Sequence, residues 1–306
     1  MSLDGKVVLV TGGARGMGRE MVRAFIREGC KVIATDLSWV PTGVSNDDFD
    51  FKEEIEDNPN VLTATMDVTL QSHVNEAYER AIDQFGTIDV IVNNGGTRQR
   101  DLYLATHGSV SILDTDISEW QQMFDTHVYG TLRVIKRFIA PLLEKRSGSV
   151  INTSSSLLAY AHPSAQGEQT VYGLSREGSY QPAKAALGSM TLFLAQELKE
   201  FNIAVNLMLP GHTATTGSDE QELVRADIRR QLGLVDPVTG KHDFVPRRVR
   251  ADNIVPLVLH LAQQDASGTT GRWIGCMDYN EQNGLGGFSD WGVEEDVERA
   301  RSLGRL

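Results

Sequence analysis

The chain has 306 residues, of which 41% are hydrophobic and 23% are charged, and its formal net charge is −12. This length is enough to bury a sizeable core and is near the upper limit for one domain. The acidic balance argues against a nucleic-acid surface. No apolar run approaches the roughly 20 residues that cross a membrane. The N-terminus enters a predicted strand by Lys6 and leaves no room for a signal peptide, so we expect a cytoplasmic protein.

Cysteines and histidines give no sign of a disulfide framework or a metal centre. The two cysteines, Cys30 and Cys276, are far apart in sequence, which is typical of a reducing compartment, and we expect Cys30 to be a buried structural thiol. The seven histidines lack the close spacing of metal ligands, so we predict no metal site. We interpret the basic run 247–250 as a solvated helix start.

Short apolar runs alternate with longer helical stretches along the chain. The predicted strands are Lys6–Val10, Lys31–Asp36, Val61–Met66, Ile88–Asn93, Ser149–Thr153, Ala204–Leu209 and Arg272–Met277. The predicted helices are Gly16–Gly29, Leu70–Phe85, Ile117–Glu144, Tyr180–Phe201 and Ala251–Gln263. The strands barely alternate in polarity, as expected for strands buried on both faces of a parallel sheet. The pattern predicts a doubly wound Rossmann-type α/β fold with three layers, α/β/α, in a single domain, 1–306.

Four stretches look like additions to this core, and each follows the carboxyl end of a predicted strand. They are 37–60, 97–118, 157–179 and 217–250. In an open α/β sheet that edge is where ligands bind, so we favour substrate-pocket walls over tolerated surface loops. The C-terminal extension 279–306 is predicted to end in a short helix. Its apolar stripe consists of Val293, Val297, Ala300 and Leu303.

A glycine-rich turn joins the first predicted strand to the first predicted helix. It reads Thr-Gly-Gly-Ala-Arg-Gly-Met-Gly over 11–18. Glycines permit a tight turn and let the backbone approach a pyrophosphate, and the helix N-terminus offers amide donors. The strand before the turn and the helix after it are the context that this motif requires. We therefore predict a dinucleotide site, and its residues in this turn are Gly12, Arg15, Gly16, Met17 and Gly18.

Asp36 ends the second predicted strand, 18 residues after Gly18. A carboxylate at this place accepts hydrogen bonds from ribose hydroxyls and repels a 2′-phosphate. The next residue, Leu37, offers no compensating cation, whereas Arg15 could reach a 2′-phosphate. We give Asp36 more weight, because a like charge beside a phosphate is costly, and so favour NAD over NADP.

Tyr180 and Lys184 are four residues apart and lie on one face of a predicted helix. A free tyrosine has a pKa of about 10, and a nearby ammonium favours the phenolate and lowers that pKa. The pair therefore predicts an acid–base device. A look-alike, Tyr172 followed by Arg176, lies closer to Ser155, but arginine is a poor substitute for lysine and glycines disfavour a helix there.

In these residues the chain resembles the short-chain dehydrogenase/reductase family from Gly5 to about Met277. Six motifs occur in the family's order: the glycine turn, Asp67-Val68, Asn93-Asn94-Gly95-Gly96, Ser154-Ser155, the Tyr180–Lys184 pair, and Pro210-Gly211 followed by Thr213 and Thr215. The resemblance implies that Ser155, Tyr180 and Lys184 are catalytic. It also implies further cofactor contacts at Asp67, Val68, Asn94, Gly95, Pro210, Gly211, Thr213 and Thr215.

Two departures from the family pattern stand out. His127 occupies a position where the family commonly has an asparagine that helps to order a proton-relay water. A histidine can both donate and accept a hydrogen bond, so a relay could survive, or the ring could simply pack beneath Lys184. The 25 residues from Ser155 to Tyr180 also form an unusually long interval. Its apolar residues, with Met208 and Leu209, suggest an apolar pocket, although they could equally be core.

These features imply an NAD-dependent oxidoreductase that interconverts a bulky, cyclic or apolar secondary alcohol and its ketone. Tyr180 would act as acid and base, Lys184 would lower its pKa and hold the nicotinamide ribose, and Ser155 would stabilise the oxyanion. An NADP-preferring carbonyl reductase and a catalytically impaired NAD(P)-binding regulatory or scaffold protein stay open as alternatives. The resemblance further implies a homodimer or homotetramer paired through the helices 117–144 and 180–201.

Overall fold

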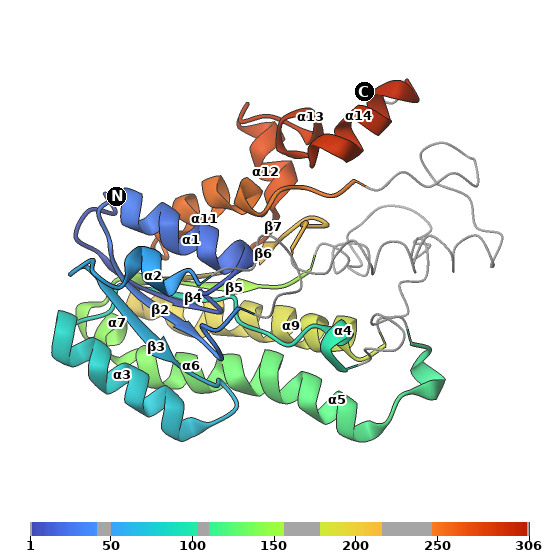
Figure 1. Cartoon of the computed structure of the whole chain (residues 1–306). Coiled ribbons are helices and arrows are strands. Elements are labelled where there is room, and N and C mark those ends of the chain that lie inside the picture. The colour runs from blue at the N-terminus through green and yellow to red at the C-terminus, as the bar shows by residue number, and fades with distance from the viewer. Residues whose placement is uncertain (1, 42–49, 103–109, 156–177, 216–246, 305) are drawn as a thin grey trace.

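A seven-stranded parallel sheet forms the centre of the computed structural model, which describes residues 2–41, 50–102, 110–155, 178–215, 247–304 and 306 (Figure 1). The strands are β1 (Val7–Thr11), β2 (Lys31–Asp36), β3 (Val61–Thr65), β4 (Val90–Asn93), β5 (Gly148–Thr153), β6 (Ile203–Leu209) and β7 (Trp273–Gly275). Their order is β3-β2-β1-β4-β5-β6-β7, and every neighbouring pair is parallel. The predicted doubly wound fold is therefore confirmed.

Helices cover both faces of the sheet. The α-helices of the described residues are α1 (Gly16–Arg27), α2 (Lys52–Ile55), α3 (Gln71–Phe85), α4 (Gln99–Leu102), α5 (Ile117–Phe124), α6 (Thr131–Phe138), α7 (Ala140–Lys145), α9 (Tyr180–Leu198), α11 (Val255–Ala262), α12 (Cys276–Gln282), α13 (Phe288–Trp291) and α14 (Glu294–Ser302). Shorter pieces are the 3₁₀ turns η2 (Ile112–Asp114), η4 (Lys199–Phe201) and η5 (Ala251–Ile254) and the π-helix η3 (Asp125–Gly130).

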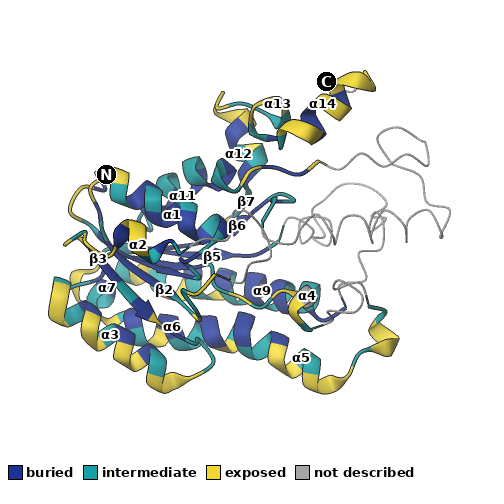
Figure 2. Ribbon diagram, in the orientation of Figure 1, coloured by how far each residue is buried: buried dark blue, intermediate teal, exposed yellow. Residues whose placement is uncertain are grey.

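Two apolar cores lie on opposite faces of the sheet, because successive strand residues point to opposite sides. Val8 and Val10 face the core beneath α1 and α11, whereas Val7 and Leu9 face the core beneath α3 and α6. Figure 2 shows the strands as mostly buried and the outer sides of α3 and α5 as exposed. This is the three-layer arrangement that the nearly continuous apolar strands predict.

The long helix predicted over 117–144 is wrong in detail, because the segment is divided into α5, η3, α6 and α7. The wider π-turn begins at Asp125 and carries His127. The break before α7 has a local cause in Pro141, which lacks the N–H that would continue the hydrogen-bond ladder. The last strand is also shorter than predicted, since α12 begins at Cys276.

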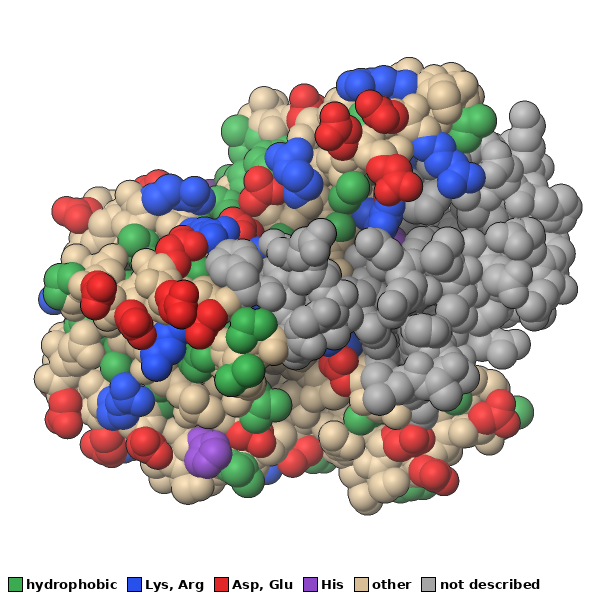
Figure 3. Space-filling model, in the orientation of Figure 1, with side chains coloured by type: hydrophobic (Ala, Val, Ile, Leu, Met, Phe, Trp, Pro, Cys, Tyr) green, Lys and Arg blue, Asp and Glu red, His purple; other side chains and the backbone are tan. Residues whose placement is uncertain are grey.

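The surface and the thiols are unremarkable for a globular α/β chain. Figure 3 shows acidic and basic side chains interspersed over the described part of the face in view. Cys30 and Cys276 are both free and buried, and burial raises the pKa of the Cys30 thiol to about 12. Within the residues that the structure describes, no helix combines the length and apolarity needed to cross a bilayer.

Candidate active site

The glycine turn lies between β1 and α1 and takes the backbone shape that only glycine adopts easily. Gly12 has a φ of +68° and Gly16 a φ of +53°, both in the left-handed region. A Cβ on Gly18 would lie 1.8 Å from the carbonyl oxygen of Gly12, so the turn and α1 pack without room for a side chain. These residues fit a pyrophosphate, because a glycine backbone without side chains directly precedes the N-terminus of a 12-residue helix.

The segment after β4 braces this turn from the neighbouring strand. The Asn94 side-chain amide donates to the carbonyl oxygens of Thr11 (3.1 Å) and Gly12 (3.2 Å). The Thr11 hydroxyl accepts from the backbone amides of Asn94 (3.0 Å) and Gly95 (2.9 Å). β1 and β4 are neighbours at the point where the strand order reverses, which is where open α/β sheets bind ligands.

Asp36 reaches back to the glycine turn from the end of β2. Its carboxylate accepts hydrogen bonds from the backbone amides of Ala14 (3.0 Å) and Ser38 (3.3 Å). Burial raises the pKa of Asp36, and these amide donors partly oppose that rise. The Arg15 guanidinium donates to the carbonyl oxygens of Ser38 (3.0 Å) and Val40 (3.3 Å), so it lies along the loop that follows Asp36. Leu37 is exposed.

The remaining predicted cofactor residues lie along the same carboxyl edge. The Asp67 carboxylate accepts from the amide (2.8 Å) and hydroxyl (2.7 Å) of Thr69. Val68 packs against Gly130, because a Cβ built on Gly130 would lie 2.7 Å from the Val68 side chain. After β6, Thr213 donates its hydroxyl to the carbonyl oxygen of Gly211 at 3.0 Å. Met17 packs on the core beneath α1, Thr215 lies against Gly16, and Pro210 is buried.

Ser155, Tyr180 and Lys184 meet where β5 ends and α9 begins. The Lys184 ammonium lies 5.5 Å from the centre of the Tyr180 ring and donates to the carbonyl oxygen of Thr153 at 2.9 Å. Gln181, the neighbour of Tyr180, donates to the Ser155 hydroxyl at 3.3 Å. Ser154 is buried and donates to the carbonyl oxygen of Lys184 at 3.2 Å, so it holds α9 against β5.

Burial dominates the electrostatics of the Tyr180–Lys184 pair. It raises the pKa of Tyr180 to about 12 and lowers the pKa of Lys184 to about 7. The net shift of the Tyr180 pKa is therefore opposite in direction to the lowering that the sequence predicts. The physical reason is that low-dielectric surroundings disfavour the charged form of both groups, so the phenol is kept protonated and the amine is readily deprotonated.

His127 is buried beside this pair. Its Nε2 lies 2.7 Å from the carbonyl oxygen of Thr97, and its ring meets the Tyr180 ring edge-on with centroids 5.3 Å apart. Burial and then the charge of Lys184 lower its pKa well below the usual value. A Cβ on Gly96 would lie 2.2 Å from His127 Cε1, so the glycine makes room for the imidazole. The ring both packs and forms a hydrogen bond, and the choice between relay and packing stays a prediction.

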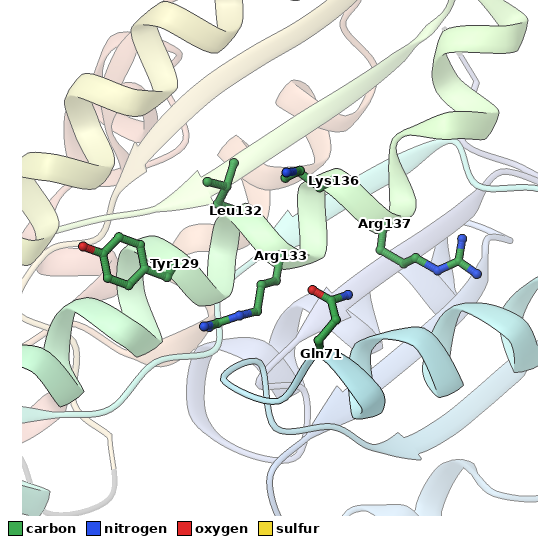
Figure 4. Close-up of a pocket in the computed structure, with 6 residues that line it drawn as sticks. All are labelled: Gln71, Tyr129, Leu132, Arg133, Lys136 and Arg137. Atoms are coloured by element: carbon green, nitrogen blue, oxygen red, sulfur yellow. The ribbon is translucent and has the colours of Figure 1, made fainter.

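Several residues considered in the sequence lie outside the described residues or in the apolar cores. Tyr172, Arg176 and most of 157–179 are outside the described residues. Met208 and Leu209 are buried in the cores, which supports the core interpretation for these two. Two further contacts at the site, from Gln181 to Ser155 and from His127 to the Thr97 carbonyl, are marked by no motif in the sequence. A surface hollow of about 380 Å³ lies on α3, η3 and α6 (Figure 4), and its lining does not include Ser155, Tyr180 or Lys184. Its lining residues are Gln71, Tyr129, Leu132, Arg133, Lys136 and Arg137.

Comparison with known proteins agrees with this geometry. The family model described as short chain dehydrogenase matches residues 6–223. A fluoren-9-ol dehydrogenase of Terrabacter sp. (strain DBF63) is 34% identical over 94% of this chain and 75% of that protein. A 3-oxoacyl-[acyl-carrier-protein] reductase of Thermotoga maritima is 28% identical over 90% of this chain and 97% of that protein. The crystal structure of levodione reductase superposes with a TM-score of 0.67 at 22% identity, covering 89% of this chain and 96% of that one, and so supports the fold.

Proposed function

This chain belongs to the short-chain dehydrogenase family and is an oxidoreductase that acts on CH–OH groups, and from that premise we propose that it interconverts a cyclic secondary alcohol and its ketone with NAD. The observation that carries the proposal is the convergence of Ser155, Tyr180 and Lys184 at the carboxyl edge of the sheet. The glycine turn and Asp36 lie along the same edge. Alcohol oxidation by hydride transfer requires acid–base groups beside a dinucleotide-binding site.

The proposed roles follow from the chemistry of each side chain. The nicotinamide ring, when bound, supplies the hydride acceptor for oxidation and the donor for reduction. As a phenolate, Tyr180 takes the hydroxyl proton of the alcohol during oxidation, and as a phenol it returns the proton during reduction. The Ser155 hydroxyl donates to the substrate oxygen as negative charge develops there. Lys184, held by the Thr153 carbonyl, would stabilise the Tyr180 phenolate in its own protonated form and would hold the nicotinamide ribose.

Asp36 supports NAD as the preferred dinucleotide. Its carboxylate stands at the end of β2, held by two backbone amides, where a 2′-phosphate would meet a fixed negative charge. Arg15 spans the loop carbonyls of Ser38 and Val40, and this placement weighs against its use as the anchor of a 2′-phosphate. Initial rates with NAD⁺ and NADP⁺ at equal concentrations test the preference.

The proposed substrate class rests on the similarity to the fluoren-9-ol dehydrogenase of Terrabacter sp.. That protein is named for fluoren-9-ol, a fused-ring secondary alcohol, and it aligns with 94% of this chain. From this similarity we propose that the substrate of this chain is a cyclic or aromatic secondary alcohol. The test measures the rate of NADH formation, by its absorbance, with NAD⁺ and a panel of cyclic, aromatic and linear secondary alcohols. Turnover of linear 3-hydroxyacyl thioesters in preference to every cyclic alcohol would overturn the substrate class.

We also propose a homodimer or homotetramer paired through α5–α6 and α9. Large apolar side chains on these helices are exposed, with Ile117 at 72%, Tyr129 at 53% and Phe193 at 64%. A hollow of about 520 Å³ beside α5 is lined by Trp120 and Phe124 among others. Exposed apolar area of this kind marks association surfaces. Sedimentation that finds only a 33.7 kDa species would contradict the assembly.

A further inference from the structure

A buried ion pair joins the segment before η5 to the last helix of the chain. The Arg248 guanidinium meets the Asp296 carboxylate through Nη2 to Oδ1 at 2.6 Å and Nε to Oδ2 at 2.8 Å. The backbone amide of Arg248 adds a third bond to Oδ2 at 2.9 Å. Arg248 is 8% exposed and Asp296 is 3% exposed. The interpretation of 247–250 as a solvated run is therefore wrong at Arg248, and its bidentate geometry is of the strong, orienting kind.

Val249, next to this pair, links the C-terminal tail to the segment after β6. On one side its amide donates to the His212 carbonyl (2.9 Å) and its carbonyl accepts from Ala214 (2.8 Å). On the other side it forms an antiparallel bridge with Gly292, flanked by a bond from the Val293 amide to the Arg248 carbonyl at 2.9 Å. Among the residues that the structure describes, Val249 therefore connects the tail directly to 211–215.

The segment 211–215 runs from the Ser155 side of the site to the glycine turn. In β6, before the segment begins, the carbonyl oxygen of Met208 accepts from the backbone amide of Ser154 at 2.9 Å, so β5 and β6 end together. At its end, Thr215 packs against Gly16, where a Cβ would lie 3.2 Å from the Thr215 methyl group. A ligand that spans the carboxyl edge from the glycine turn to Tyr180 must pass this segment.

We infer that Arg248 and Asp296 are positioning residues, through which α14 holds 211–215 in place for the nicotinamide half of the dinucleotide. The inference rests on the proposed function, since it concerns the same site. Figure 1 shows α13 and α14 beyond α12, at the end of the molecule away from α3. The pair acts at a distance from the adenine half, which Asp36 and the start of the glycine turn would hold. Loss of the pair should therefore weaken one half of the dinucleotide selectively.

The test compares Asp296→Asn with the wild-type chain in binding NADH and ADP-ribose, a ligand that lacks nicotinamide. The substitution removes the buried counter-charge of Arg248 and leaves only the exposed carboxylate of Glu295, 3.5 Å away, of the two carboxylate partners that the structure describes, which destabilises the segment. We expect the dissociation constant for NADH to rise about tenfold, a typical coupling between sites, and that for ADP-ribose to change less than about twofold. Asp252→Asn is the matched control, because Asp252 pairs with exposed Arg250 in the same segment, and it should leave both constants unchanged.

Hydrogen exchange of the wild-type chain provides a second measurement that needs no variant. Linkage is reciprocal, so NADH should slow exchange in peptides covering 288–302, whereas ADP-ribose should not. Equal weakening of both ligands in Asp296→Asn, or tail exchange that NADH leaves unchanged, would overturn the inference while leaving the proposed function intact. Wild-type protein that binds neither ligand would overturn both. If Asp296→Asn fails to fold, the exchange result decides.

Discussion

His127 presents its ring edge-on to Tyr180, with the two ring planes at 85° and the centroids 5.3 Å apart. Because its Nε2 lies at hydrogen-bond distance from a carbonyl oxygen, which can only accept, the proton belongs on Nε2 and Nδ1 is left as an acceptor. A neutral imidazole of fixed tautomer thus packs against the proposed acid–base residue. This arrangement has a measurable cost at low pH.

Replacing His127 by Asn should make the chain less sensitive to acid. The pKa of His127 is lowered well below 6.5, first by burial and then by the charge of Lys184. The unfolded chain therefore binds a proton below pH 6.5 that the folded chain excludes, and stability is lost as the pH falls. His127→Asn should flatten the decline of Tm between pH 7 and pH 5, pH values that bracket the ordinary pKa of histidine. A decline as steep as that of the wild type would refute this account.

Tyr180→Phe should remove turnover and spare dinucleotide binding. The change deletes the hydroxyl that exchanges the proton and keeps the ring that packs on His127. We expect kcat to fall about 10²- to 10⁴-fold, the usual contribution of a general acid–base group. NADH fluorescence titration should give an unchanged Kd. Tyr129→Phe, at an exposed tyrosine, is the control and should keep full activity. Retained turnover in Tyr180→Phe would remove Tyr180 from the mechanism.

Lys184→Met should abolish activity and yet stabilise the fold. Burial lowers the pKa of Lys184 from 10.5 to about 7, so the unfolded chain holds more protons between these pH values. Stability that depends on this group therefore increases as the pH rises from about 7 towards 10.5. The variant should have a higher Tm at pH 7 and lack the rise towards pH 9, a window inside that range.

Lys199→Met is the matched control for this experiment, because Lys199 is exposed at the end of the same long helical segment. It should keep the activity and the pH dependence of the wild type. A Lys184→Met variant that is less stable than the wild type at neutral pH would show that the ammonium hydrogen bond to Thr153 outweighs the cost of burial.

Asp36→Ser should shift the preference between dinucleotides. The carboxylate accepts from the amides of Ala14 and Ser38, and a serine hydroxyl keeps an acceptor there without the charge. We expect the ratio of kcat/KM for NAD⁺ to that for NADP⁺ to fall at least about tenfold, which corresponds to about 1.4 kcal/mol. Asp57→Ser, at an exposed aspartate after α2, serves as the control. An unchanged ratio would assign the preference to other residues.

The strands, the glycine turn and the helix of the catalytic pair could be predicted because short sequence patterns determine local backbone conformation. β2 has the predicted bounds, Lys31–Asp36, since a parallel strand buried on both faces needs an unbroken apolar run. The glycine turn could be predicted from the sequence, because glycine takes the positive φ angles seen at Gly12 and Gly16 without the steric cost of a Cβ. The spacing of Tyr180 and Lys184 likewise placed them on one turn of α9.

Contacts between residues far apart in the chain could not be predicted from the sequence. Asp296 reads as an acidic residue suited to a helix start, and Arg248 as part of an exposed basic run, yet 48 residues apart they form a buried pair. The π-turn that carries His127 has no marker in the sequence. The pKa of Tyr180 moved opposite to the expected direction, because desolvation depends on every atom packed around a group. The sequence by itself determined the family of folds and the chemical groups at its edge, whereas the tertiary structure decided their charge states and what holds them in place.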